Sequence, residues 1–306
     1  MRVEKRKRTL RERAPRALCW ALILGAVVLA VTLKATRAPG VIVIQSDGAT
    51  SCPASSPFDY TCCIAGTEPG CDCQGAWLFD GNTPALLGVD QCDEATYQDG
   101  SDDMTALDAP TPSATKPANS PAGHYSLSFD GTDDGMSGED SAGLFDNMEP
   151  SGDYTLVFWI YMADATPGSM ATAINKSDST NGYYALVDTD ATLRYEHEGD
   201  NEISNATFSD ATWAHVCVAW DNAGTPGQYI YINGVQDNTG AATSSLTATT
   251  IDLTFGQGQS TELACYLYEV AFFDVLLSSF ECCEICRFGL EGDTTDRTCG
   301  SCDYTP

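Results

Sequence analysis

Short segments rich in β-branched and aromatic residues follow one another between residues 125 and 273, and they constrain the fold more than any other feature of the chain. Gly, Asn and Asp separate these segments, as tight turns between antiparallel strands require. One of them, Tyr154–Tyr161, is apolar on both faces, which predicts a central strand covered on both sides. The predicted strands are 125–129, 154–161, 183–187, 193–197, 214–220, 228–233, 251–255 and 265–273.

Only one segment after these strands has a clear helix signal. Ser278 and Glu281 have the spacing of a capping box, so a helix is predicted over Ser278–Leu290. Residues 101–122 contain four prolines among Ser, Thr and Ala, which predicts a surface loop or linker. We therefore expect an all-β, two-sheet jelly-roll sandwich with one short C-terminal helix over residues 76–292.

The N-terminal region has the pattern of a membrane-targeting segment. Residues 17–33 are apolar and uncharged, and at about 1.5 Å per residue they would span roughly 25 Å, just short of the usual hydrocarbon thickness. A cleaved signal peptide is the alternative, but Pro39 and the charged residues Lys34 and Arg37 favour an uncleaved single transmembrane helix. The basic tail 1–16 would then be cytoplasmic, and everything after the helix periplasmic or extracellular.

The charge of the chain is divided sharply at this segment. The sequence has a net charge of −28, but the residues after position 37 include only five Lys and Arg against 41 Asp and Glu, a net charge of −36. So acidic a body would repel phosphates, which excludes nucleic acid as a partner. It is also poorly suited to anionic glycans, whereas neutral sugars, cations or a basic protein surface fit it better.

Thirteen cysteines follow the apolar segment, a density typical of disulfides in an oxidising compartment. Most lie in a Cys-rich stalk (34–75), at the end of the sandwich or in a Cys-containing tail (293–306), and their odd number leaves one thiol without a partner in the chain. The spacing of Cys283, Cys286, Cys299 and Cys302 also matches a four-thiolate zinc site, although export favours disulfides. The disulfide candidates are Cys52, Cys62, Cys63, Cys71, Cys73, Cys92, Cys217, Cys265, Cys282, Cys283, Cys286, Cys299 and Cys302.

Several motifs occur in a fixed order along the predicted sandwich. They are Trp77-Leu-Phe-Asp80-Gly with Ser126-Leu-Ser-Phe-Asp130-Gly-Thr-Asp-Asp134, the segment Tyr154–Tyr161, Thr212-Trp-Ala-His-Val-Cys-Val-Ala-Trp220-Asp221, Tyr229-Ile-Tyr-Ile-Asn-Gly234, and Leu267-Tyr-Glu-Val-Ala-Phe-Phe273 with Leu276-Leu-Ser278. Over about 76–290 the chain thereby resembles the concanavalin-A-like, laminin-G-like jelly rolls. The resemblance implies the fold, but that fold carries lectins, adhesion modules and glucanases.

The resemblance also raises the question of a structural calcium ion. The family's Asp and Arg in the closing strand are Tyr268 and Ala271 here, which puts one such site in doubt. Asp80 and Asp130 remain candidate calcium ligands, and the run Asp130–Asp134 could supply further oxygens. The alternative interpretation of Asp130-Gly131 is a turn.

Glucanases of this fold carry carboxylates two residues apart on one strand, a spacing that Glu198, Asp200 and Glu202 share. Gly199 and Asn201 lie between them, which favours a hairpin turn, so no catalytic residue is assigned.

The other residue types that carry chemistry also favour packing. His124, His197 and His215, and the aromatic residues Trp159, Trp213 and Trp220, could line a site, but residues of this kind on strands more often belong to the core.

We expect a non-catalytic, membrane-anchored binding or adhesion module for glycan or protein, with calcium as the one candidate cofactor. The alternatives are a structural accessory subunit of a membrane assembly and a glycoside hydrolase.

Overall fold

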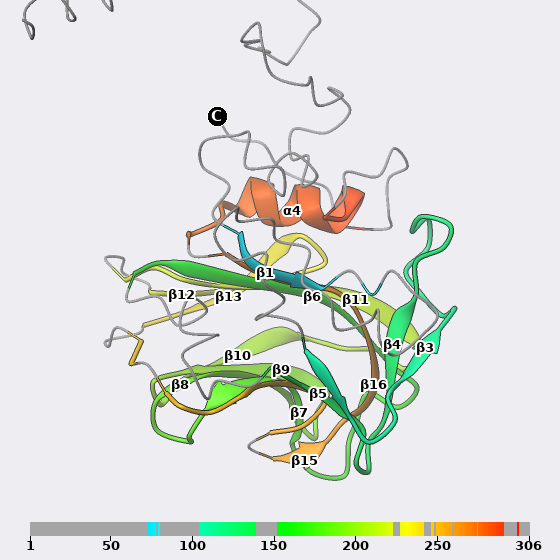
Figure 1. Ribbon diagram of the computed structural model, residues 1–306. Coiled ribbons are helices and arrows are strands. Elements are labelled where there is room, and N and C mark those ends of the chain that lie inside the picture. Colours follow the sequence, from blue (N-terminus) through cyan, green and yellow to red (C-terminus); the bar gives the residue numbers. More distant parts are fainter. Residues whose placement is uncertain are drawn as a thin grey trace, which may run out of the picture. The chain divides into compact units, whose positions relative to one another are not determined.

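In the part of the chain that the structure describes, the strands form two sheets that pack face to face, with one helix outside them (Figure 1). The computed structural model describes residues 73–77, 79, 104–138, 152–222, 227–241, 246–247, 249–258, 260–273, 275–290 and 299. The predicted all-β, two-sheet sandwich with a short C-terminal helix is confirmed in these residues.

Sheet A has a continuous strand order in which three of the six neighbouring pairs are not consecutive in sequence. The order is β13 (Val235–Gly240), β12 (Gln228–Ile232), β11 (Thr212–Trp220), β6 (Tyr154–Met162), β16 (Ala264–Phe273), β4 (Ser126–Asp130) and β3 (Thr111–Ser113), and β1 (Cys73–Trp77) also pairs with β16.

Sheet B lies opposite. Its order is β10 (Asp200–Thr207), β9 (Thr192–His197), β8 (Gly182–Val187), β7 (Ala171–Ser177), β14 (Leu253–Phe255), β5 (Gly135–Gly138) and β2 (Thr105–Leu107), and β15 (Thr261–Glu262) pairs with β7.

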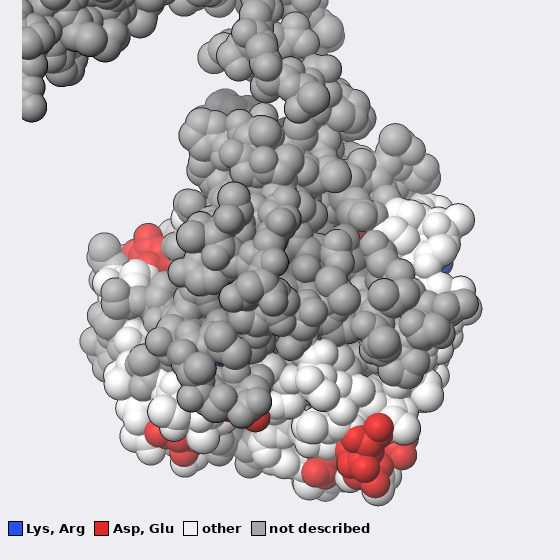
Figure 2. All heavy atoms as spheres, viewed as in Figure 1, with Lys and Arg blue, Asp and Glu red and all other residues white. Residues whose placement is uncertain are grey.

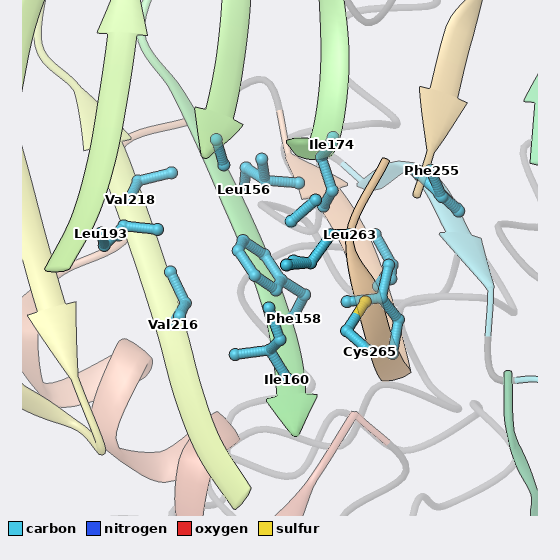
Figure 3. Close-up of a cluster of buried hydrophobic side chains, with 14 of the residues drawn as sticks. Leu156, Phe158, Ile160, Ile174, Leu193, Val216, Val218, Phe255, Leu263 and Cys265 are labelled. Carbon is cyan, nitrogen blue, oxygen red and sulfur yellow. The ribbon is translucent and has the colours of Figure 1, made fainter. Parts of the chain in front are cut away.

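The core fills the space between the sheets and is centred on β6. Leu156, Phe158 and Ile160 of β6 point inward among aliphatic and aromatic side chains of both sheets (Figure 3). The alternate residues Val157 and Trp159 point to the other side and are also buried. The prediction that Tyr154–Tyr161 forms a central strand covered on both faces is therefore confirmed, with β11 and β16 as its two neighbours.

Helix α4 (Ser279–Phe288) covers the outer face of sheet A (Figure 1). Its residues Cys282 and Ile285 pack on Val157 and Tyr231 of that face. A disulfide between Cys217 of β11 and Cys282 joins the helix covalently to the sheet, across 65 residues of sequence. The helix shields the outer face of sheet A from water, and the inner face packs against sheet B. Both sides of β6 are therefore buried, which explains why its residues are apolar on both sides.

A β-bulge in β16 changes which side chains face the core. Cys265 and Leu267 point inward before it, and Val270 and Phe272 point inward after it, so the alternation shifts by one residue. Glu269 lies in the bulge with φ 47°, in the left-handed region. Because of the extra residue, Val270 and Phe272 face the core where an unbroken alternation would have placed Glu269 and Ala271.

The structure corrects the prediction of a loop over residues 101–122. Strands β2 and β3 both lie within it, at the edges of the two sheets. Pro112 is tolerated because an edge strand needs hydrogen bonds on one side only. At the other limit, β1 begins at Cys73, so the predicted domain boundary at residue 76 falls inside a strand.

Several predictions fall outside the residues that the structure describes. They concern the membrane segment 17–33, the tails 1–16 and 293–306 apart from Cys299, most of the stalk 34–75, Asp80, the side chain of Cys73, and the cysteines Cys52, Cys62, Cys63, Cys71, Cys92 and Cys302. Among the described residues, no helix has the length and apolar character needed to cross a membrane.

The capping box of α4 gives a direct test of the helix start. The Ser278 side chain accepts a hydrogen bond from the Glu281 N–H, and the Glu281 carboxylate accepts one from the Ser278 N–H at 2.7 Å. Replacing Ser278 by Ala should lower the free energy of unfolding by about 1 kcal/mol. Denaturant unfolding measures the change, and Ser279→Ala, one residue into the helix, should cost much less. Equal effects of the two substitutions would contradict a capping role for Ser278.

Candidate functional site

The three carboxylates with glucanase-like spacing lie at the β9–β10 hairpin. Glu198 and Gly199 form the turn, with φ values of 51° and 81°, and Asp200 and Glu202 belong to the start of β10. Two of the three carboxylates accept hydrogen bonds from other parts of the fold. That of Glu198 accepts hydrogen bonds from the backbone N–H of Gly182 at 2.8 Å and Thr247 at 2.7 Å, and that of Glu202 accepts one from the Asn238 amide at 2.5 Å.

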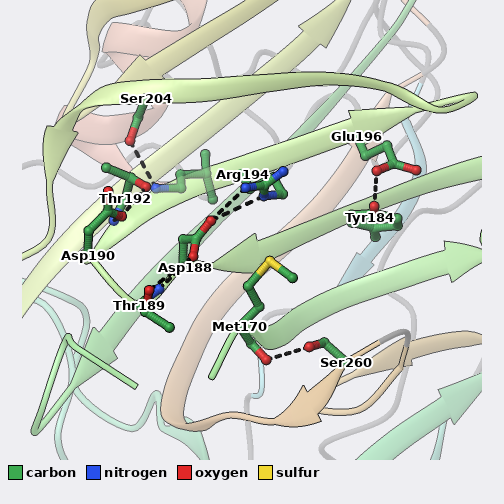
Figure 4. Close-up of polar contacts among 11 residues, drawn as sticks. Met170, Tyr184, Asp188, Thr189, Asp190, Thr192, Arg194, Glu196, Ser204 and Ser260 are labelled. Carbon is green, nitrogen blue, oxygen red and sulfur yellow. Dashed lines mark hydrogen bonds and ion pairs between the residues drawn. The ribbon is translucent and has the colours of Figure 1, made fainter. Parts of the chain in front are cut away.

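The outer face of sheet B carries polar side chains that are paired with one another (Figure 4). The Arg194 guanidinium lies 2.7 Å from the carboxylate of Asp188, and its hydrogen bond lowers the pKa of Asp188. The Tyr184 hydroxyl donates a hydrogen bond to Glu196, a carboxylate only 8% exposed, and burial raises the pKa of Glu196. These side chains therefore have their partners on the same face of their own sheet.

The raised pKa of Glu196 predicts a pH dependence of stability. A carboxyl group whose pKa is higher in the folded than in the unfolded protein favours folding at low pH, and this contribution is lost as pH rises through the folded pKa. Glu196→Gln should therefore unfold at higher denaturant concentration than the native protein at neutral pH. The difference should close below the ordinary carboxyl pKa of 4.5. Denaturation of both proteins over a pH series measures it, and a difference that stays constant with pH would refute the assignment.

An acidic cluster lies in the loop between β4 and β5. Carboxylate oxygens of Asp130, Asp133 and Asp134 lie within 4.8 Å of one another. Repulsion from Asp108, with smaller contributions from desolvation and from Asp130 and Asp134, raises the pKa of Asp133. Figure 2 shows a large acidic patch near the end of the sandwich where β15 lies in Figure 1.

The predicted turn is also present in this loop. Gly131 has φ 76°, and the Asp130 carboxylate accepts a hydrogen bond from the Thr132 N–H at 2.8 Å. The Asp134 carboxylate accepts from the N–H groups of Ala109 and Asp130, each at 3.1 Å. The same carboxylates thus shape the loop and leave further oxygen lone pairs open to a cation.

The described cysteines of the candidate zinc set, Cys283, Cys286 and Cys299, are disulfide-bonded. Cys286 pairs with Cys299, and Cys283 is also disulfide-bonded, so the four-thiolate set is not available to a metal. Cys265 was a disulfide candidate, and the structure corrects this: its thiol is free and buried in the core. Burial raises the pKa of that thiol, because the thiolate would lose its hydration.

The histidines on strands pack as the sequence indicated. His215 and His197 are fully buried, and their rings contact Trp159 and Trp220 respectively, with centroids 5.2 Å and 3.9 Å apart. His124 lies at the sheet margin, within 3.3 Å of the Tyr268 hydroxyl.

Trp213, in contrast, is partly exposed and belongs to a row of aromatic residues that sequence reasoning did not find. In the register of sheet A it pairs with Tyr161, which pairs with Tyr266 on the other side. The ring centroids of Tyr161 lie 5.5 Å from those of Trp213 and 5.4 Å from those of Tyr266. All three side chains are partly exposed. The row comes from strands far apart in sequence, so spacing along the chain does not reveal it.

A family model described as the concanavalin A-like lectin/glucanases superfamily matches residues 130–283. The chain belongs to this superfamily, as its motifs indicated. No curated protein sequence matches it.

Several solved structures align with this chain at low sequence identity. The receptor binding domain of botulinum neurotoxin C/D mosaic serotype aligns with a TM-score of 0.50 and 12% identity, covering 70% of this chain and 51% of that one. The binding domain of botulinum neurotoxin DC, in complex with rat synaptotagmin II, gives 0.48 and 12%, with the same coverages of 70% and 51%. A Trypanosoma rangeli sialidase gives 0.48 and 12%, covering 71% and 33%. This chain thus spans about half the length of the neurotoxin domains.

Proposed function

We propose that the protein is a non-catalytic binding module, anchored in a membrane by residues 17–33, that recognises a glycan or a protein outside the cytoplasm. The superfamily contains both lectins and glucanases, so the use of the carboxylates decides between the two. The observation that carries the proposal is that Glu198 and Glu202 accept hydrogen bonds from the fold itself. A general acid and a nucleophile would instead have to face one substrate from both sides of the scissile bond.

The disulfides support the proposed location. Cys217–Cys282 and Cys286–Cys299 form in the part of the chain that the structure describes. Disulfides persist in oxidising compartments and are rare in the cytosol. This agrees with an N-terminal anchor whose basic tail stays in the cytoplasm, and with a sandwich that is periplasmic or extracellular.

A solved structure of the same fold supports a binding role. The botulinum neurotoxin domain that aligns at a TM-score of 0.50 is described as a receptor binding domain. By analogy alone, a sandwich of this kind can present a recognition surface without a catalytic centre.

The proposal is tested with the full-length protein in a mild detergent. We expect saturable binding to a glycan array or to extracellular protein, and no release of reducing sugar from glucans. Glu198→Gln should bind as the native protein does, because Glu198 serves the hairpin rather than a ligand. Sugar release that depends on Glu198 would overturn the proposal in favour of a hydrolase. Co-purification at fixed stoichiometry, lost when residues 1–40 are removed, would instead identify an accessory subunit.

We further propose that a calcium ion bridges Asp130, Asp133 and Asp134, a donor set of carboxylates that suits this cation. A bound cation would relieve the repulsion that raises the pKa of Asp133. Millimolar calcium should raise the melting temperature of the native protein, and Asp133→Asn should remove that rise. Asp164→Asn, in a separate loop, is the control. No shift of the native melting temperature with calcium or with a chelator would refute the site.

A further inference from the structure

We propose that the aromatic row of Trp213, Tyr161 and Tyr266 on the outer face of sheet A is the binding platform for a neutral oligosaccharide. This inference rests on the proposed binding function and narrows it to a ligand class and a surface.

The sheet geometry directs these three side chains away from the core. On β6, Leu156, Phe158 and Ile160 face the core, so Tyr161 faces outward. On β11 the inward residues are Ala214, Val216 and Val218, which places Trp213 on the same outer face. Tyr266 lies between the inward residues Cys265 and Leu267 of β16. The row is therefore a consequence of alternation and register, and it crosses three adjacent strands.

Among the described residues, α4 covers the row of side chains next to this one. The next row along the strands contains His215, Trp159 and Tyr268, paired in the same register. These three are buried, and Trp159 and Tyr268 pack against Cys286 of α4. Trp213 packs at the margin of that cluster, as does Cys299, the disulfide partner of Cys286. The buried row therefore packs against the partly exposed one through Trp213, whose ring centroid lies 6.3 Å from that of Tyr268.

The chemistry of the row suits a sugar. A pyranose ring offers apolar C–H faces and a rim of hydroxyls, and aromatic side chains with a polar tip match both. Neither Tyr161 nor Tyr266 uses its hydroxyl in a hydrogen bond within the described residues, so both hydroxyls are available to a ligand. Ser128 of β4 pairs with Tyr266 and extends the row, and Thr111 of β3 pairs with Ser128 in turn. These two residues add two further hydroxyls along the same line.

The charge of the protein makes a neutral ligand the better match. The residues after position 37 carry a net charge of −36, so an anionic glycan would be repelled. Lys116, on the loop after β3, contributes only one positive charge, and its ammonium group already donates hydrogen bonds to the carbonyl oxygens of Pro121 and His124. A standard protein interface buries about 800 Å² on each partner, far more than three partly exposed rings provide.

The experiment titrates the full-length protein, in a detergent without sugar headgroups, with cello-, laminari-, manno- and xylohexaose, and with a sulfated oligosaccharide. Binding is followed by calorimetry and by tryptophan fluorescence. We expect at least one neutral hexaose to bind, and the sulfated one not to bind. Trp213→Ala and Tyr161→Ala should each weaken binding at least about tenfold, which corresponds to about 1.4 kcal/mol.

The matched control is Tyr229→Ala. Tyr229 is also partly exposed and on sheet A, but it lies on β12 opposite Ala219, near the other end of β11. The Tyr229→Ala variant should bind the hexaose as the native protein does. Melting temperatures of all variants separate loss of binding from loss of folding, and Trp213→Phe, which keeps an aromatic ring, should recover part of the affinity.

Three results would overturn the inference: no neutral hexaose binds, the sulfated one binds as well, or Trp213→Ala binds as tightly as the native protein. If the native protein binds an extracellular protein but no hexaose, the inference fails while the proposed binding function stands. If binding to that protein is lost in Trp213→Ala, the row is a protein contact and the glycan assignment is likewise wrong.

Discussion

The pairing of β6 with β11 on one side and β16 on the other is the constraint on which the rest of the structure depends. Nine consecutive residue pairs join β6 to β11, from Thr212–Met162 to Trp220–Tyr154. A shift of one residue would turn Leu156, Phe158 and Ile160 out of the core and bring Val157 and Trp159 into it. Because both faces of β6 are apolar, a slip would not be excluded by burial alone. The cross-strand partners and the disulfide from Cys217 to α4 remove that ambiguity.

In the folded protein, several acidic side chains are stabilised by backbone N–H groups rather than by basic side chains. With five Lys and Arg after position 37, most carboxylates have no cation to pair with. Several accept hydrogen bonds from backbone N–H groups instead: Glu198 from Gly182 and Thr247, and Asp237 from Asn205 and Ala206. Such charge-assisted hydrogen bonds stabilise turns and strand ends without a cation. Carboxylates spaced as in a hydrolase can thus be structural in so acidic a chain.

Much of the fold could be predicted from local pattern. The capping box at Ser278, the turn at Glu198–Gly199 and the central strand around Phe158 each depend on neighbours in sequence, and each is present. The prediction failed where local pattern is weak. β7 contains small and polar residues (ATAINKS), and it forms a strand through its pairing with β8 and β14. β2 and β3 lie in a Pro-rich segment that becomes strand only by pairing at sheet edges.

The candidate sites also differ in how much of them could be predicted from local sequence. Asp130, Asp133 and Asp134 lie within one loop, so sequence alone brought them together. The isolation of Cys265 depends on its position on the core-facing side of β16, and the pairing of Cys217 with Cys282 depends on where α4 packs on sheet A.

The amino-acid sequence by itself determined the class of fold, the sign of the charge and the family, because these follow from alternation, composition and short motifs. Only the tertiary structure decided that Trp213, Tyr161 and Tyr266 form one row while Trp159 and Trp220 are buried. The reason is physical: strands β6, β11 and β16 meet through non-local hydrogen bonds, and exposure depends on where α4 and its disulfides stop covering the sheet.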